Sequence, residues 1–176
     1  MSQITYTIDP AHSTAGFKVR HLMVSNVRGE FSNLTGTVVF DTDTPANSTV
    51  KASIDATTVN TRDEQRDGHL KSPDFFDTAK FPTITFVSKK VAGSDGEFKV
   101  AGDLTIHGVT KEVVLTVEGP APEVKDPWGN VKSGASATTK INRKDFGMVF
   151  NMALETGGVM VGEEIAIQLE LELLKS

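Results

Sequence analysis

The stretch Ile165-Ala166-Ile167-Gln168-Leu169-Glu170-Leu171-Glu172-Leu173 alternates apolar residues with mostly polar ones. Successive side chains of a β-strand point to opposite faces, so this segment predicts a strand with one buried face. Seven earlier segments repeat the period of two. Their apolar stripes contain Ala15, Phe17 and Val19; Gly36, Val38 and Phe40; Val50, Ala52 and Ile54; Ile84 and Phe86; Phe98, Val100, Gly102, Leu104 and Ile106; Val113, Leu115 and Val117; and Ala135, Ala137, Thr139 and Ile141.

These eight stripes predict an all-β fold with eight strands. Turn signals such as Gly93-Ser94-Asp95-Gly96 and His107-Gly108 separate most of them, and short connections favour antiparallel neighbours. Periodicity alone leaves both a sandwich and a closed barrel open. Between the third and fourth strands, Thr61-Arg62-Asp63-Glu64 has the pattern of a capping box and predicts a short helix to about Leu70. Ser72-Pro73 predicts a second helical turn after it.

The composition is that of one globular domain covering residues 1–176, with 38% hydrophobic and 23% charged residues. There is no cysteine, which excludes disulfides and thiol chemistry. The net charge of -5 argues against nucleic acid as a partner and against anionic membrane surfaces. No secretory signal and no apolar run of membrane-spanning length is visible, so the expected protein is soluble and cytoplasmic.

The sequence contains no motif for nucleotide binding, nucleophilic hydrolysis or zinc proteolysis. His69 lies near Asp67 and Asp74, but no set of three ligands has the spacing of a metal site, so hydrogen bonding at a helix end is the preferred interpretation. The carboxylates of Asp63 and Glu64 complement the dipole of the predicted helix. We therefore expect no metal, no cofactor and no catalytic residue.

The aromatic residues are ten Phe, one Tyr and one Trp. Phe side chains have no polar group and suit the wall of a dry space, although packing in a filled core explains any single one equally well. Phe75 and Phe76 are placed to cap one mouth of a barrel. The residues expected to line an internal tunnel are Phe17, Val19, Phe31, Val38, Phe40, Ile54, Phe75, Phe76, Phe81, Ile84, Phe86, Phe98, Leu104, Leu115 and Phe146.

Several segments, in order along the chain, resemble the YceI-like family. They are Asp9-Pro10-Ala11-His12-Ser13, Val27-Arg28-Gly29-Glu30-Phe31, Arg66-Asp67-Gly68-His69-Leu70-Lys71-Ser72-Pro73-Asp74-Phe75-Phe76-Asp77, Phe81-Pro82-Thr83-Ile84-Thr85-Phe86, Gly102-Asp103-Leu104-Thr105-Ile106-His107-Gly108-Val109-Thr110-Lys111 and Ile141-Asn142-Arg143-Lys144-Asp145-Phe146-Gly147. The resemblance implies a lipocalin-like antiparallel barrel. It also implies an internal tunnel for a polyisoprenoid chain, such as a polyprenyl phosphate, a quinone tail or a similar amphiphile. Many members of the family are periplasmic.

If the ligand carries a phosphate, a cation must meet it at the tunnel mouth. The candidates are Arg20, His21, Arg28, Arg62 and Arg66, while Arg143 is expected to pin a loop. The predicted function is to carry or store an apolar lipid, without catalysis and with transient exchange with membranes. Two alternatives remain: an enzyme acting on a small apolar substrate inside the barrel, and a packed barrel with a structural or stress role. The long final strand also permits a homodimer.

Overall fold

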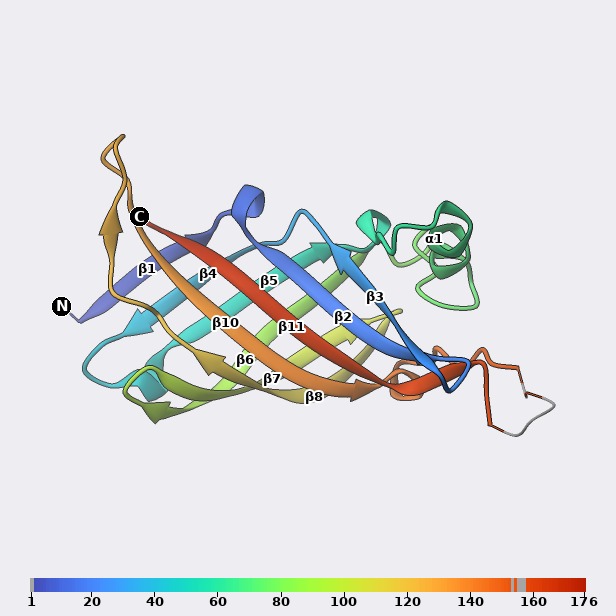
Figure 1. The fold of residues 1–176 in the computed structure, drawn as a ribbon. Helices are drawn as coiled ribbons and strands as arrows, with labels where there is room; N and C mark the ends of the chain where they lie inside the picture. Colours follow the sequence, from blue (N-terminus) through green and yellow to red (C-terminus); the bar gives the residue numbers. More distant parts are fainter. Residues whose placement is uncertain (1, 153, 155–157) are drawn as a thin grey trace.

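The computed structural model describes residues 2–152, 154 and 158–176, which form an eleven-stranded antiparallel sheet and one α-helix (Figure 1). The helix α1 is Glu64–Lys71. The strands are β1 Gln3–Ile8, β2 Thr14–His21, β3 Ser25–Phe31, β4 Thr35–Asp41, β5 Thr49–Asp55, β6 Thr83–Ser94, β7 Glu97–Ile106, β8 Val109–Glu118, β9 Val124–Lys125, β10 Val131–Asn142 and β11 Val161–Lys175. Short 3₁₀ turns lie at Pro10–His12, Pro45–Asn47, Ala56–Thr58 and Arg143–Phe146.

Eight of the strands close into a barrel because β11 pairs with β10 on one side and with β1 on the other. The ring runs β11-β1-β4-β5-β6-β7-β8-β10. The predicted all-β barrel with eight wall strands is therefore confirmed, but its membership differs. The sequence interpretation missed β1, although Ile4, Tyr6 and Ile8 alternate in it, and placed β2 in the ring instead.

The β2–β3 hairpin extends the wall at one end of the ring. β2 pairs with the first part of β11, and β3 pairs with β2 and bridges through Glu30 to Asn60. The interpretation also missed β3, in which Val27, Gly29 and Phe31 alternate. Position 29 favours glycine, because a Cβ there would lie 2.3 Å from the Phe17 ring. Since glycine adds no apolar side chain, the alternating pattern of β3 is too weak to recognise by hydrophobicity.

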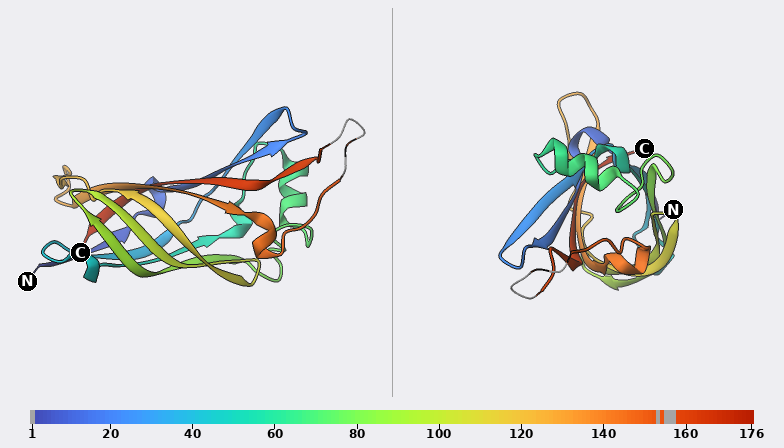
Figure 2. Two further views of the ribbon diagram at one scale, coloured as in Figure 1. Left: turned by 90° about the horizontal axis from the view of Figure 1, so that it is seen from below. Right: turned by 90° about the vertical axis from the view of Figure 1, so that its right-hand side faces the viewer.

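The two ends of the barrel carry different structures (Figures 1 and 2). The α1 end is formed by α1, the turn between β2 and β3, and the chain that follows the Arg143–Phe146 turn. The β9 end is formed by β9, the two termini and the connections β4–β5 and β6–β7. The cavity described below runs between these two ends.

The helical insert lies where it was expected, between β5 and β6, but its start is different. The N-cap is Asp63, whose side chain accepts a hydrogen bond from the Arg66 N–H at 3.1 Å. Thr61 instead donates through both its hydroxyl and its N–H to Asp67 Oδ1. The positive φ of 65° at Arg62 prevents the helix from starting there. Ser72 caps the end of α1, and the residues after it form turns, not the second helical turn that was predicted.

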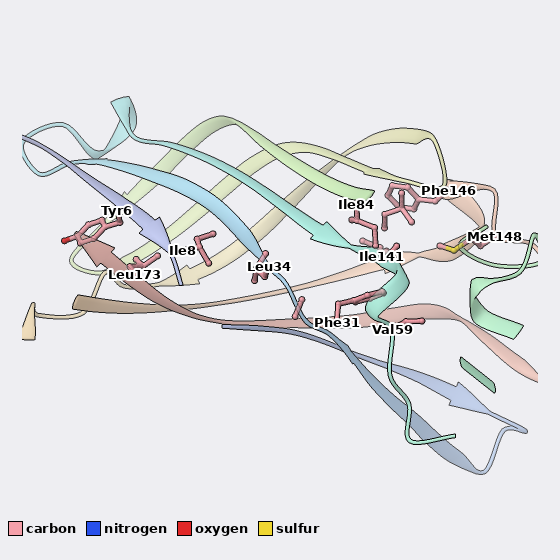
Figure 3. Packing of buried hydrophobic residues seen from close by; sticks show 13 residues of the cluster. Tyr6, Ile8, Phe31, Leu34, Val59, Ile84, Ile141, Phe146, Met148 and Leu173 are labelled. Atoms are coloured by element: carbon pink, nitrogen blue, oxygen red, sulfur yellow. The ribbon is translucent and has the colours of Figure 1, made fainter. Parts of the chain in front are cut away.

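The buried apolar residues run along the barrel from Tyr6 and Leu173 near one end to Phe146 and Met148 near the other (Figure 3). A second buried cluster contains Phe86, Val91, Phe98, Val100, Leu115 and Ala137. Gly102 makes room for one of these rings, since a Cβ at that position would lie 2.5 Å from the Phe86 ring and 2.6 Å from the Val87 carbonyl oxygen. The apolar stripes thus surround an axial space instead of filling a single packed layer.

Candidate functional site

A cavity of about 290 Å³ lies inside the barrel. The apolar stripes of the wall strands line it, as alternation predicts for a barrel interior. Every predicted lining residue borders it except Phe81 and Phe146. Lining residues that the interpretation did not single out as ligand contacts include Ile8, Leu34, Val50, Val91, Val100, Ile106, Val113, Val117, Ile141, Ile165, Ile167, Leu169, Leu171 and Leu173.

Phe81 and Phe146 do not line the cavity: the Phe81 ring packs against the β7–β8 turn, and Phe146 belongs to the buried core cluster. The Phe81 ring meets the His107 ring edge-on at 5.1 Å between centroids. His107 Nδ1 donates a hydrogen bond to the Phe146 carbonyl oxygen at 3.1 Å, and the Phe146 side chain is 1% exposed. The residue type Phe predicts burial, but it does not reveal whether the ring reaches the cavity.

At the β9 end the lining finishes in aromatic residues. Phe40 on β4 and Phe98 on β7 pack edge to face, with 5.8 Å between ring centroids. Gly119 and Pro120, in the connection from β8 to β9, border the cavity beside them. No ionisable side chain among the described residues lines this end.

At the α1 end the lining includes every ionisable side chain that borders the cavity within the described part of the chain. These side chains are Arg20, His21, Arg66, His69 and Arg143, and all five are basic types. Three of the predicted head-group candidates are thus brought together at one mouth. The other two, Arg28 and Arg62, do not line the cavity.

The three arginines at this mouth differ in how many donors they have left. Arg66 donates through Nε and Nη2 to the hydroxyl and carbonyl oxygens of Thr61, at 2.8 and 2.6 Å, and lies 3.9 Å from Asp63. Arg20 makes one hydrogen bond, to the Met23 carbonyl oxygen at 3.1 Å. A guanidinium carries five N–H donors, so Arg20 retains the larger share for a ligand.

Arg143 is a structural residue at the same mouth. Its side chain is 2% exposed and donates to the carbonyl oxygens of Gly162, Met148 and Val161 at 2.8, 2.7 and 3.2 Å. Burial lowers the pKa of Arg143, and Glu163 opposes that shift. Among the described residues no carboxylate oxygen lies within 4.0 Å of it. The predicted role of Arg143 in pinning a loop is thus what its contacts show.

His69 combines a hydrogen bond with aromatic packing. Its Nε2 lies 2.9 Å from Asp74 Oδ2, which is the helix-end hydrogen bond expected from the sequence. Its ring packs edge-on against Phe75 and Phe150, with 5.0 and 4.9 Å between centroids. Sequence reasoning did not place His69 or Phe150 at the cavity, because their meeting depends on the path of the chain after Arg143.

One group of metal-type ligands lies away from the cavity, where Asp9, His12 and Glu172 come together. His12 Nδ1 is 2.9 Å from Asp9 and 3.8 Å from Glu172. Lys132 Nζ lies 2.7 Å from Glu172 and 3.6 Å from Asp9, and its hydrogen bond to Glu172 raises the pKa of Lys132. The hydrogen bond from His12 lowers the pKa of Asp9. An ammonium group already balances these carboxylates, so the cluster fits an ion-pair network better than a metal site.

None of the helices in the described residues combines the length and the apolar character needed to cross a membrane.

A family model described as the YceI-like domain matches residues 6–173. The chain belongs to the YceI-like family. A UPF0312 protein of Staphylococcus aureus strain MSSA476 is 42% identical over 167 residues, covering 95% of each chain. A solved Campylobacter jejuni YCEI protein is 33% identical, with a TM-score of 0.73 and coverage of 89% of this chain and 90% of that one.

Two further solved structures share the YceI-like fold at lower identity. Burkholderia cenocepacia BcnA aligns with a TM-score of 0.79 and 22% identity over 94% of this chain and 98% of its own. A polyisoprenoid-binding domain from Saccharophagus degradans aligns with a TM-score of 0.69 and 18% identity over 97% of this chain and 98% of its own. At these identities the likeness shows the fold alone.

Several of the segments that resemble the YceI-like family supply helix caps, turns and side-chain hydrogen bonds that hold loops. Asp9 caps the Pro10–His12 turn, and Asn142 caps the turn that begins with Arg143. These residues hold the strands and loops in register around the cavity. They therefore identify the fold more firmly than they identify a ligand.

Proposed function

We propose that this YceI-like protein carries or stores one polyisoprenoid-type lipid, held non-covalently with its tail in the barrel cavity. The observation that carries the proposal is the polarity of the lining. The wall is apolar along the barrel, and its ionisable side chains lie at the α1 end. Such an arrangement suits an amphiphile with a long apolar tail and one polar end. The Saccharophagus degradans domain with the same fold, described as polyisoprenoid-binding, supports this class of ligand.

The energetics favour exchange with membranes over permanent capture. Each CH₂ group moved from water into an apolar site gains about 0.8 kcal/mol. A bilayer interior is equally apolar, so the same group gains almost nothing when it moves from a membrane into the cavity. The protein would then hold a tail against water while releasing it readily to a lipid phase.

Arg20 is the residue we assign to an anionic head group. It lies at the α1 mouth and has the most unused donors of the three arginines there. Charge-assisted hydrogen bonds to a phosphate are stronger than those between neutral groups. Arg20→Gln should therefore weaken binding of a polyprenyl phosphate while leaving the affinity for the corresponding polyprenol almost unchanged.

Catalysis on an apolar substrate is the weaker alternative. An acid–base mechanism needs convergent groups that can give and take a proton. No carboxylate lines the described cavity, and its polar side chains toward the interior include Ser48 and Thr139. Ser48 accepts a hydrogen bond from the Asp41 N–H, and Thr139 donates to the Val114 carbonyl oxygen. These contacts support binding over chemistry, and the open interior counts against a fully packed structural barrel.

Native mass spectrometry of the purified protein, with organic extraction of anything bound, tests the proposal. We expect a co-purifying apolar chain, or uptake of an added polyprenyl phosphate. Ala137→Phe places a ring in the lining halfway along β10 and should abolish retention of long tails. Thr138→Phe is the matched control, because its side chain is exposed and absent from the lining.

An apo mass that persists after incubation with polyprenyl phosphates and quinones would contradict the proposal. So would equal retention of the tail by the Ala137→Phe variant and the wild type, since a tail inside the barrel must pass the new ring. Either result would favour the alternative of a packed barrel with a surface function.

A further inference from the structure

Five exposed apolar side chains gather at the α1 end. They are Leu22, Met23 and Val24 in the β2–β3 turn, and Val149 and Met152 after the Arg143–Phe146 turn. Val24 is 75% exposed and Val149 is 62% exposed. We call this set the apolar rim. A water-soluble surface rarely keeps such residues together without a partner that covers them.

The rim is one connected surface. The Leu22 N–H donates to the Met160 carbonyl oxygen at 2.8 Å, and the Met160 N–H donates to the Met152 carbonyl oxygen at 2.9 Å. The two segments that form the rim, the β2–β3 turn and the chain after the Arg143–Phe146 turn, both lie at the α1 end (Figure 2). Backbone pairing therefore holds the two apolar segments on either side of Met160.

The rim continues directly into the cavity lining. Arg20 and His21, which line the cavity, immediately precede Leu22. Met148 and Phe150, which also line it, flank Val149. An apolar partner seated on the rim would thus meet the mouth through which we propose that a lipid tail passes.

The β2–β3 turn uses residues that its backbone does not favour. The Val24 N–H donates to the His21 carbonyl oxygen at 3.2 Å, and the two central residues, Leu22 and Met23, have φ of 53° and 63°. Positive φ at both positions is the pattern of a type I′ turn, in which Asn-Gly is strongly preferred. Leu and Met are disfavoured here both by conformation and by exposure to water, which points to a function for their side chains.

The same hairpin is locally cationic. Residues 14–31 carry Lys18, Arg20 and Arg28 against one carboxylate, Glu30, although the whole chain has a net charge of -5. No ion pair involves these three side chains among the described residues. Charges beyond about 10 Å are screened at 0.1 M salt, so a surface in contact with the rim responds to these cations more than to the net charge. The charge of this hairpin is opposite in sign to the net charge on which the sequence-based argument against anionic membranes rests.

We propose that the apolar rim docks the α1 end onto a bilayer that contains anionic phospholipid. Apolar side chains enter the interface while Lys18, Arg20 and Arg28 meet the head groups, as in other peripheral membrane contacts. The passage of a tail between this bilayer and the cavity rests on the proposed function; the docking itself does not. The β9 end also exposes Val124 and Trp128, but neither lines the cavity, and the charges next to them, Glu123, Lys125 and Asp126, are of mixed sign.

Vesicle flotation of the full-length protein tests the docking. The vesicles contain phosphatidylethanolamine with phosphatidylglycerol, and a second set contains only zwitterionic phosphatidylcholine. We expect the wild type to float with the anionic vesicles and less with the zwitterionic ones. The double variant Leu22→Asn/Met23→Gly should lose roughly tenfold or more in affinity, since two apolar side chains are removed. Arg28→Gln should lose about fivefold.

The double variant also carries its own folding control. Asn-Gly is the preferred pair for these φ values, so the melting temperature should stay equal or rise. Trp128→Ser removes an even more exposed apolar side chain from the β9 end and should float like the wild type. If the double variant floats like the wild type, or if Trp128→Ser alone abolishes flotation, the proposal is overturned. A dimer that the double variant loses would assign the rim to a second copy and overturn it equally.

The outcomes for docking and for ligand binding are separable. A wild type that retains polyprenyl phosphate in native mass spectrometry but does not float would refute the docking and leave the proposed function intact. A wild type that floats through the rim but never retains a tail would support the docking and refute the proposed function. The double variant, loaded from detergent, should retain the tail like the wild type.

Discussion

The two ends of the barrel differ in how their exposed apolar residues lie relative to the cavity. At the β9 end Phe40 and Phe98 line the cavity and pack against each other. Tyr6 is buried at the same end, and its hydroxyl donates a hydrogen bond to Glu123. At the α1 end the apolar residues of the rim are exposed, and the basic side chains of the mouth border the cavity. The exposed Val124 and Trp128 at the β9 end do not line the cavity, whereas the rim at the α1 end continues into the cavity lining.

Under the proposed function, the two ends of the barrel would therefore have different roles in binding the tail. Packing of aromatic rings is suited to stopping a tail, and an apolar rim with nearby cations is suited to receiving one. The α1 end also depends on the Arg143 side chain, which donates to backbone carbonyl oxygens there. Each of the following predictions separates the two ends by a measurable effect.

The largest expected effect comes from truncating Phe98, one of the two rings that we expect to stop the tail at the β9 end. Phe98→Ala removes a buried ring and should destabilise the protein by about 3–5 kcal/mol in urea unfolding. It should also lengthen the cavity, so that longer polyprenyl chains are retained in native mass spectrometry. Phe81→Ala is the control, because this ring packs outside the lining and its loss should not change the preferred chain length. A lower stability without a change in chain length would show that Phe98 does not limit the tail.

The next effect concerns Arg143, whose side chain holds the loop at the α1 end through three hydrogen bonds to backbone carbonyl oxygens. Arg143→Met leaves three carbonyl oxygens without their donor and should cost about 2–3 kcal/mol of unfolding free energy. Hydrogen exchange should increase in residues 148–152 and at the start of β11 while the β9 end stays protected. Arg62→Met, at an exposed position, should change stability by less than about 0.5 kcal/mol. Uniform loss of protection through the barrel would contradict a local pinning role.

The smallest effect is a pH dependence at the β9 end. Burial, with the hydrogen bond and charge of Glu123, raises the pKa of Tyr6 from 10.0 to about 12. The folded state thus prefers the neutral phenol, and the stabilisation is present below pH 10 and is lost as the pH rises toward 12. The loss should be on the order of 2 kcal/mol.

Tyr6→Phe should abolish this alkaline loss, because phenylalanine has no proton to release. The measurement is the urea midpoint of the wild type and of the variant from pH 8 to 12. The difference between the two should shrink steadily above pH 10. Two curves that stay parallel over this range would show that Tyr6 ionises as easily in the folded state as in the unfolded one.

Alternation in the sequence predicted which side chains of the wall strands face inward. Leu169 and Leu171 on β11 and Ala135 and Ala137 on β10 line the cavity as their stripes require. The prediction failed where no side chain signals the strand, as at Gly29 in β3. It also failed for Phe81 and Phe146, because hydrophobicity records that a residue is buried but not against which surface. The cap at Asp63 was missed because Thr61 had a competing local partner in Asp67.

The sequence by itself determined the strand period, the place of the helical insert and the family, since these depend on local alternation and on short motifs. Only the tertiary structure decided that β11 closes the ring with β1, that Arg20, Arg66 and His69 share one mouth, and that Met160 pairs with both Leu22 and Met152. Each of these meetings joins residues distant along the chain. Local pattern sets the face of each strand, but long-range backbone pairing sets which faces and ends come together.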